Sequence, residues 1–283
     1  MRITHPGKEL WPSAGITKAA YLAYLNFVAD RLLAFSRGRP AMLLRHPRGQ
    51  ACSGFYQKNL PAWAPGWLQT YQECRGGRST RYLVLSEPAD LIWVGNQDAL
   101  EIHTWLATVD DPEHPDLLVF DLDPAGGAGF AEAVTVAQIL RRLLQTLNLV
   151  CWVKTSGGSG LHIYVPLQPG PGHQEVRRFA QQVASLLAKS HPELITLERK
   201  PDRRGSRVYI DYLQNGRGRT MIAPYSPRAT PQATVSTPLD WDELDSVDPL
   251  SLTISTVPKR LASLGDPWQE IMRRRGRLPG WEG

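Results

Sequence analysis

Two aspartates one residue apart, Asp121 and Asp123, end an apolar run in the segment LLVFDLDP at residues 117–124. Successive side chains on a strand point to opposite faces, so both carboxylates would share one face while Leu122 points to the other. Like charges repel unless a cation lies between them, and Mg²⁺ and Mn²⁺ prefer oxygen ligands from carboxylates and substrate phosphates. The segment indicates either a metal site for phosphate chemistry or the solvated end of a strand.

A glycine-rich turn followed by an alternating strand occupies residues 156–167, SGGSGLHIYVPL. Glycines let backbone amides approach an anion closely, and His162 and Tyr164 would share one face of the strand. The P-loop pattern G-x-x-x-x-G-K-[ST] is absent, and a strand rather than a helix follows. The segment by itself fits an anion-binding turn or an ordinary tight hairpin.

A lone carboxylate, Asp211, lies on a strand predicted over residues 207–213. Basic loops flank that strand, with ERKPDRRGSR at 198–207 and QNGRGRTMIAPYSPR at 214–228. We therefore expect Asp211 to be a third metal ligand inside an electropositive rim.

Cations and aromatic residues near the N-terminus form two weaker candidates. His5, Lys8 and Lys18 could build a phosphate pocket, although scattered solvated cations are the more common arrangement, and Lys18 in the first turn of a helix gains nothing from the helix dipole. Phe55 and Tyr56, followed by Lys58, could stack on a base and contact a phosphate, or they could be one core ring and one surface ring.

A single histidine, His103, lies on a strand predicted over residues 100–106, on the face opposite Ile102 and Thr104. Histidines that stand alone on a strand are more often structural than functional. Its type and position alone do not assign it a role.

Helical periodicity predicts three long helices and a short C-terminal one. Thr17 is a typical N-cap for the first, which would run to about Phe35, and the others would span residues 130–147 and 173–190. The last helix would start at Asp266 and Pro267 and end in an arginine run. A hairpin with a basic, glycine-containing tip is expected over residues 70–82.

The bulk composition is that of a globular protein. The 283 residues are 42% hydrophobic and carry a formal charge of +5, which suits a polyanionic partner without requiring one. No apolar window approaches the ~20 residues that cross a bilayer, and no signal-peptide core is found, so we expect a cytoplasmic, nucleoid-associated protein. Three cysteines without C-x-x-C spacing predict buried thiols rather than disulfides or a zinc site.

Five motifs in order resemble the polymerase domain of bacterial ligase D and its standalone relatives in prokaryotic non-homologous end joining, within the archaeo-eukaryotic primase superfamily. They are HTW at 103–105, DLDP at 121–124, KTSGG-x-G-x-H at 154–162, DY-x-x-N at 211–215 and PYSPR at 224–228. The resemblance runs from about Ile3 to Trp268.

The fold that the resemblance implies is α/β (α+β). An RRM-like antiparallel catalytic sheet would pack against an N-terminal α/β lobe, with helices outside. The whole chain, 1–283, would be a single primase-polymerase domain with lobes at 1–100, 101–230 (RRM-like) and 231–283, the last a helical wrap.

The resemblance also implies roles for individual residues. Asp121, Asp123 and Asp211 would bind two divalent ions, Mn²⁺ in preference to Mg²⁺; Ser156, His162 and Arg228 would hold the triphosphate; and His103 would contact the nucleotide sugar. Phe55 and Tyr56 would meet the nucleobase or template; His5, Lys8, Lys18 and Lys58 would grip a DNA 5'-phosphate; and Arg204 would help arrange the metal site.

The implied activity is addition of ribonucleotides, and less readily deoxyribonucleotides, to DNA 3' ends at gaps and overhangs. The implied partners are NTP or dNTP, DNA with double-strand breaks, gaps or 3' overhangs and a 5'-phosphate, and Ku and a DNA ligase, with no membrane. Two positions depart from the family: Ser159 replaces a frequent Lys, and Gln214 a frequent Arg. Both changes remove a cation near the proposed phosphates, which bears on nucleotide affinity and metal dependence.

Two other functions fit parts of the pattern. A haloacid-dehalogenase-type phosphatase also begins with D-x-D after an apolar strand, but it expects Thr or Val where this chain has Ala125 and leaves residues 156–162 unexplained. A catalytically silent adaptor that binds DNA ends would need the basic residues without the three acids.

Overall fold

The computed structural model describes residues 1–280 and divides the chain into two compact units. Unit 1 comprises Met1–Asp110, Thr220–Thr237 and Leu250–Asp266, and unit 2 comprises Asp111–Arg219, Pro238–Pro249 and Pro267–Gly283. These boundaries differ from the expected lobes, since two segments beyond residue 219 belong with the N-terminal unit. The chain therefore passes between the units several times, which local sequence patterns do not reveal.

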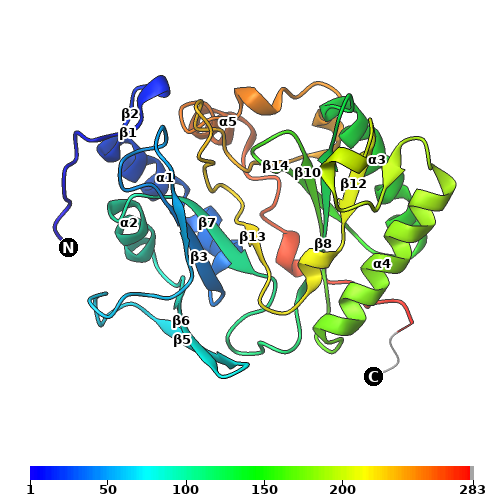
Figure 1. Ribbon diagram of the computed structural model, residues 1–283, viewed down its shortest axis with the longest axis horizontal. Coiled ribbons are helices and arrows are strands. Elements are labelled where there is room, and N and C mark those ends of the chain that lie inside the picture. Colours follow the sequence, from blue (N-terminus) through cyan, green and yellow to red (C-terminus); the bar gives the residue numbers. More distant parts are fainter. Residues whose placement is uncertain (281–283) are drawn as a thin grey trace. The chain divides into compact units, whose positions relative to one another are not determined.

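Unit 1 is built on an antiparallel sheet in the order β13-β7-β3-β6-β5, with β4 paired to β3. Its strands are β3 Pro40–Arg45, β4 Phe55–Gln57, β5 Thr70–Arg75, β6 Arg78–Val84, β7 Ala99–Trp105 and β13 Thr220–Ile222. A separate pair joins β1 Glu9–Trp11 and β2 Ile16–Thr17, and the helices are α1 Lys18–Ser36, α2 Pro88–Asn96 and α5 Val257–Leu264 (Figure 1). The predicted basic hairpin is thus β5 and β6.

Helix α1 begins where its capping residue predicts. The Thr17 hydroxyl accepts the Ala20 N–H at 3.3 Å, which satisfies one of the first free amides of the helix. Tyr21, Leu25 and Val28 on one side are fully buried. The expected first helix is confirmed.

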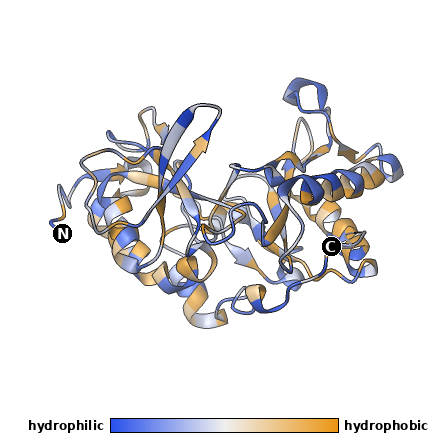
Figure 2. Cartoon of the chain, turned by 90° about the horizontal axis from the view of Figure 1, so that it is seen from below, coloured by the Kyte–Doolittle hydropathy of each residue, from blue (hydrophilic) through white to orange (hydrophobic). Residues whose placement is uncertain are grey.

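Unit 2 is built on a mixed sheet in the order β11-β12-β8-β10-β9-β14, antiparallel except between β11 and β12. Its strands are β8 Leu117–Pro124, β9 Trp152–Thr155, β10 Leu161–Pro166, β11 Ile195–Thr196, β12 Val208–Asp211 and β14 Pro238–Leu239. Helices α3 Phe130–Thr146 and α4 His173–Ser190 both contact β8, and Figure 2 shows their apolar and hydrophilic sides. The expected α/β class with antiparallel sheets is confirmed.

The expected C-terminal helix is wrong. From Pro267 the described chain contains a single short 3-10 turn, Ile271–Arg273. The Gly276 N–H then donates to the Pro166 carbonyl at 2.9 Å, and residue 276 pairs with Leu167 in a parallel bridge. The arginine run therefore starts in the 3-10 turn and leads into the pairing at Gly276, where backbone hydrogen bonds to the end of β10 take the place of a helix.

No helix among residues 1–280 is long and apolar enough to cross a membrane.

The three thiols differ in exposure, so the prediction that all are buried is wrong for Cys74. Cys151 is buried, Cys52 is half-buried and Cys74 is exposed on β5. Burial raises the pKa of the Cys151 thiol to about 12, so this thiol stays protonated at neutral pH. Because only the thiolate is nucleophilic, Cys151 should react slowly with thiol reagents.

We expect a maleimide at pH 7 to label Cys74 before Cys151, measured by peptide mass spectrometry over time. In guanidinium chloride Cys151 should label as quickly as Cys74. Fast labelling of Cys151 in the folded chain would contradict its burial.

Candidate active site

The three predicted acids lie on one face of the sheet in unit 2. Strands β12 and β8 are antiparallel, with Asp211 directly opposite Asp121 and Tyr209 opposite Asp123. Direct cross-strand neighbours point to the same side, and so do residues two apart on one strand. Alternation of β8 sends Phe120 and Leu122 to the other, fully buried face, which fixes the side that the carboxylates occupy.

Two basic residues extend this arrangement into a row across four strands. His162 on β10 lies opposite Asp121, and Lys154 on β9 lies opposite His162. His162 Nε2 is 3.2 Å from Asp121 Oδ1, and Lys154 Nζ is 2.9 Å from His162 Nδ1. Because an ammonium group can only donate, Nδ1 accepts, so the neutral ring carries its proton on Nε2, the ring nitrogen next to Asp121 Oδ1. The row fixes both the ring orientation and the tautomer of His162.

Lys154 is a functional candidate that the sequence reasoning did not single out. Its side chain is fully buried, and a buried ammonium group is costly without hydrogen-bonding partners. A lysine between Val153 and Thr155 on a buried strand was the available signal. Without the register of β9 with β10, that signal could not be linked to His162.

Asp211 is held by its own turn. Its Oδ1 accepts the Leu213 N–H at 2.8 Å, and its Oδ2 accepts the Gln214 amide at 2.9 Å. Gln214, one of the two departures from the family, is therefore a direct neighbour of a predicted metal ligand. Burial and the Asp211 carboxylate also raise the pKa of the Tyr209 phenol, which stays neutral beside the site.

Arg204 approaches the second aspartate of the pair. Its Nη1 is 3.9 Å from Asp123 Oδ2, and its guanidinium lies 4.0 Å from the centre of the Tyr209 ring. Its Nε also donates to the Glu198 carbonyl at 3.0 Å. The structure thus brings the predicted loop arginine to the predicted metal ligands and holds it there by stacking.

The glycine-rich segment forms a tight turn between β9 and β10. The Ser156 hydroxyl accepts the N–H groups of Gly158 and Gly160 at 3.1 and 3.2 Å, and Gly157 has φ of 76°. A Cβ at Gly160 would collide with the Leu122 carbonyl on β8, so this glycine is required for close packing. Ser156 is therefore a turn-forming residue whatever it binds, and Ser159 at the tip is exposed.

The carboxylate oxygens of the three aspartates are suitable ligands for a hard cation, but the three side chains do not converge on a single point. Among residues 1–280, no three His, Cys, Asp or Glu side chains form a ready group that could hold a metal ion. The Asp123 side chain is 45% exposed and the Asp121 side chain 16%. Cross-strand and diagonal neighbours lie roughly 5–8 Å apart, so the oxygen donors fit Mg²⁺ or Mn²⁺ provided the side chains close around the ion.

In unit 1, a buried acid organises two predicted nucleotide ligands. Glu101 accepts His103 Nε2 at 2.9 Å and the Ala229 N–H at 2.9 Å, and Arg228 Nε lies 3.3 Å from it. Burial alone would raise the pKa of Glu101, but the His103 hydrogen bond, the Arg228 and His103 charges and the Ala229 amide together lower it. Glu101 is 3% exposed, and the sequence reasoning did not select it. Its position between apolar residues in ALEIHTW was the only signal.

The aromatic pair on β4 is at the surface. Phe55 and Tyr56 are 49% and 58% exposed, so the expectation of one core ring and one surface ring is not met. The Tyr56 ring lies edge-on to His103, with ring centroids 5.9 Å apart. Two exposed rings beside a predicted sugar contact give a platform on which a base could stack.

Two of the N-terminal cations meet at one carboxylate. Lys8 Nζ and Lys18 Nζ lie 2.6 and 2.8 Å from the oxygens of Asp98, and Lys18 is 2% exposed. Scattered solvated cations do not describe these two residues. His5 lies in the turn before Lys8, and Lys58 is exposed just after β4.

The chain matches one family model, described as "LigD, primase-polymerase domain", over residues 17–268. It is 36% identical to the bifunctional non-homologous end joining protein LigD of Bacillus subtilis over 275 residues, which is 96% of this chain and 44% of that protein. It is 34% identical to the multifunctional LigD of Mycolicibacterium smegmatis, over 94% of this chain and 35% of that protein. The chain therefore spans less than half the length of these relatives.

A solved structure resembles the whole chain. The polymerase domain of Mycobacterium tuberculosis ligase D, in complex with DNA, superimposes with a TM-score of 0.90 at 33% sequence identity. The similarity covers 98% of this chain and 99% of that domain. The likeness thus extends over both units and beyond the motif residues.

Proposed function

The chain belongs to the LigD primase-polymerase domain family, and we propose that it is a nucleotidyltransferase that extends DNA 3' ends at gaps and overhangs during non-homologous end joining. The observation that carries the proposal is the row of Asp211, Asp121, His162 and Lys154 across one sheet face. Phosphoryl transfer depends mainly on positioning and charge stabilisation, and this row supplies fixed carboxylates beside a fixed imidazole N–H and a buried ammonium group.

The acids and the cations would divide the work. Asp121, Asp123 and Asp211 would hold two divalent cations, Mn²⁺ or Mg²⁺, which would activate the primer hydroxyl and stabilise charge on the triphosphate. His162 would donate a hydrogen bond from Nε2 to a phosphate oxygen, and buried Lys154, which donates to Nδ1, keeps this tautomer in place. Arg204 would limit the repulsion among the acids from the side of Asp123.

In unit 1, Glu101 would prepare His103 and Arg228 for the nucleotide. The Glu101 carboxylate holds the His103 and Arg228 side chains in one orientation. Little side-chain entropy would therefore be lost when a nucleotide binds to them. We propose that His103 contacts the sugar and favours ribonucleotides, that Arg228 and Ser156 contact the triphosphate, and that Phe55 and Tyr56 meet the base or template.

Primer extension decides between this function and an adaptor that only binds DNA ends. Purified protein with Mn²⁺ should extend a 5'-phosphorylated gapped duplex and use ribonucleotides more readily than deoxyribonucleotides. Binding of the duplex without extension under either metal would favour the adaptor. Family membership gives no support to the haloacid-dehalogenase-type phosphatase.

A DNA 5'-phosphate is the proposed ligand of His5, Lys8, Lys18 and Lys58. Two lysines share a single carboxylate at Asp98, which leaves a net positive charge for a phosphate. A charge-assisted hydrogen bond is worth about 1.5–3 kcal/mol, so removing the phosphate from gapped DNA should weaken binding roughly tenfold. Fluorescence anisotropy with matched 5'-phosphate and 5'-hydroxyl duplexes measures the ratio.

The variant Lys8→Gln should bring that ratio close to one, and the control Arg75→Gln, on the exposed hairpin of β5, should preserve it. Equal affinity of the wild-type chain for both duplexes would reject the phosphate role. Ku and a DNA ligase are further proposed partners on the basis of family membership.

A further inference from the structure

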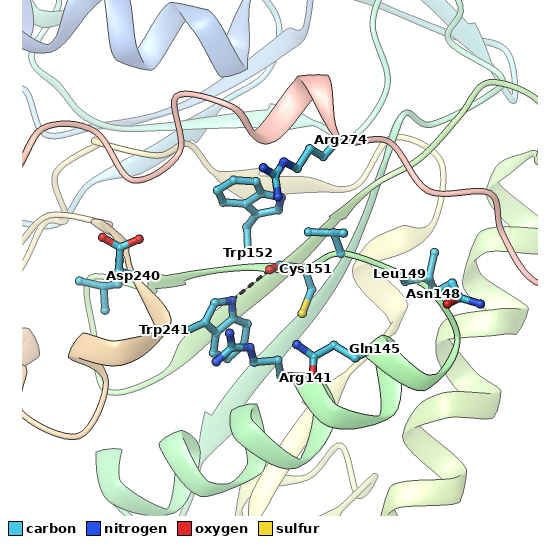
Figure 3. A pocket seen from close by; sticks show the side chains of 11 residues that line it. Arg141, Gln145, Asn148, Leu149, Cys151, Trp152, Asp240, Trp241 and Arg274 are labelled. Atoms are coloured by element: carbon cyan, nitrogen blue, oxygen red, sulfur yellow. Dashed lines mark hydrogen bonds between the residues drawn. The ribbon is translucent and has the colours of Figure 1, made fainter.

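A cavity of about 410 Å³ lies in unit 2 beside the end of α3 and the start of β9. Figure 3 shows its lining, in which two tryptophans and two arginines stand out: Trp152, Trp241, Arg141 and Arg274. None of these residues belongs to the predicted active site, and β9 runs from this cavity at Trp152 to the glycine-rich turn at its other end. Small-ligand pockets are typically about 300–1,000 Å³, so the cavity is large enough for a mononucleotide.

The aromatic part of the cavity is held in place. Trp241 Nε1 donates to the Cys151 carbonyl at 3.0 Å, and the Arg141 guanidinium lies 4.7 Å from the centre of the Trp241 ring. Trp152 Nε1 is buried and has no acceptor within residues 1–280. Buried donors are rarely left unpaired, because the lost hydrogen bond costs about 1–3 kcal/mol. Trp241 Nε1 is already paired and Trp152 Nε1 is covered, so a ligand in the cavity would use the indole rings as stacking surfaces.

The two arginines at the cavity have no carboxylate partner within the described chain. The two arginines that flank Arg274 do, since Arg273 Nη1 bonds Glu270 at 2.8 Å and Arg275 lies 3.8 Å from Asp116. A guanidinium without a counter-ion is suited to a phosphate, which it can bind with two parallel hydrogen bonds. The C-terminus of α3 also lies at the cavity. Its partial negative charge is reduced, because the N–H groups of residues 147–149 donate to carbonyls of the last helical turn.

We propose that this cavity is a second ligand site, for a nucleoside phosphate. The base would lie against Trp152 and Trp241, and the phosphate would contact Arg141 and Arg274. Stacking on aromatic rings together with arginine contacts is the general chemistry of nucleotide binding by proteins. The source could be a free nucleotide or one nucleotide of a single strand, which share this chemistry. The proposal is independent of the catalytic function.

Titration calorimetry with AMP, and separately with a 5'-phosphorylated trinucleotide, tests the site in the presence of EDTA. The double variant R141Q/R274Q should bind at least one of the two roughly tenfold more weakly than wild type, as expected for lost charge-assisted hydrogen bonds. The matched control R142Q/R273Q changes the adjacent arginines, which do not line the cavity, and should bind like wild type. Binding of AMP indicates a free nucleotide, and binding of the trinucleotide alone indicates a single strand.

Equal affinities of wild type and R141Q/R274Q for both ligands, or no binding of either ligand to wild type, would overturn the proposal. Thermal melting confirms that each variant is folded, and Trp241→Leu gives a second way to remove the site. R141Q/R274Q should still extend primers at the wild-type rate. A wild-type chain that bound nucleotide here but extended no primer would contradict the proposed polymerase function and leave the cavity site standing.

Discussion

An Asp121→Asn variant is expected to extend primers at least about a thousandfold more slowly than wild type, because losing a metal ligand removes several kcal/mol of charge stabilisation and each 1.36 kcal/mol is tenfold in rate. Asp121 is the central member of the row, facing Asp211 on one side and His162 on the other. Asparagine has the shape of aspartate but lacks the negative charge. That charge would bind the cation, and it also lies next to His162 Nε2. Single-turnover extension of a gapped duplex in Mn²⁺ measures the loss.

The matched control is Asp245→Asn, an exposed aspartate that accepts the Gln138 amide and lies on neither β8 nor β12. It should extend at the wild-type rate. Gapped-duplex binding without metal should be unchanged in both variants, which separates chemistry from DNA affinity. Wild-type extension by Asp121→Asn would refute the assignment of the three carboxylates.

Glu101→Gln is expected to destabilise the chain by about 3 kcal/mol, since removing one partner of a buried ion pair leaves the other charge uncompensated. Three donors converge on this carboxylate: His103 Nε2, Arg228 Nε and the Ala229 N–H. The amide of glutamine presents a single acceptor oxygen and turns an N–H group toward a donor. Urea unfolding at pH 7 measures the change, and Glu270→Gln, which removes an exposed pair with Arg273, should change stability by less than about 1 kcal/mol.

The stability difference between wild type and Glu101→Gln should depend on pH. The folded-state pKa of Glu101 lies below its ordinary value, so the carboxylate contributes its full stabilisation above the unfolded pKa of about 4.3 and loses it as the pH falls through the folded value. Unfolding curves from pH 7 to pH 3 should therefore show the two chains converging below about pH 4. A difference that stays constant over this range would show that charge is not the cause.

The same variant should weaken nucleotide binding, because Glu101 orients both proposed nucleotide ligands of unit 1. The affinity for ribonucleoside triphosphate in Mn²⁺ is the relevant measurement. A variant that is destabilised but binds nucleotide normally would restrict Glu101 to a structural role.

Several features of this chain were determined by local sequence. Thr17 caps α1, the long amphipathic helices fall at residues 130–146 and 173–190, and β8 ends in the two acids. These features depend on a capping side chain or on one periodicity along a single element. Motif order also predicted the family, which the match over residues 17–268 confirms.

Other features needed the tertiary structure. Lys154 is a buried charge whose partner His162 lies on another strand, and Glu101 is a buried charge whose partners Arg228 and Ala229 come from a distant loop. Both sets of partners therefore depend on strand register and on the path of the chain. The predicted last helix does not form, because the Gly276 N–H donates to the carbonyl of Pro166, which lies 110 positions away along the chain. Cys74 is exposed because it lies on the outward face of β5, together with Thr70 and Gln72.

The sequence alone therefore determined which acids share a face with which neighbours on their own strand, because alternation is a property of a single strand. Only the tertiary structure decided that Asp211, Asp121, His162 and Lys154 form one row, because pairing of strands far apart in sequence is set by side-chain packing over the entire sheet.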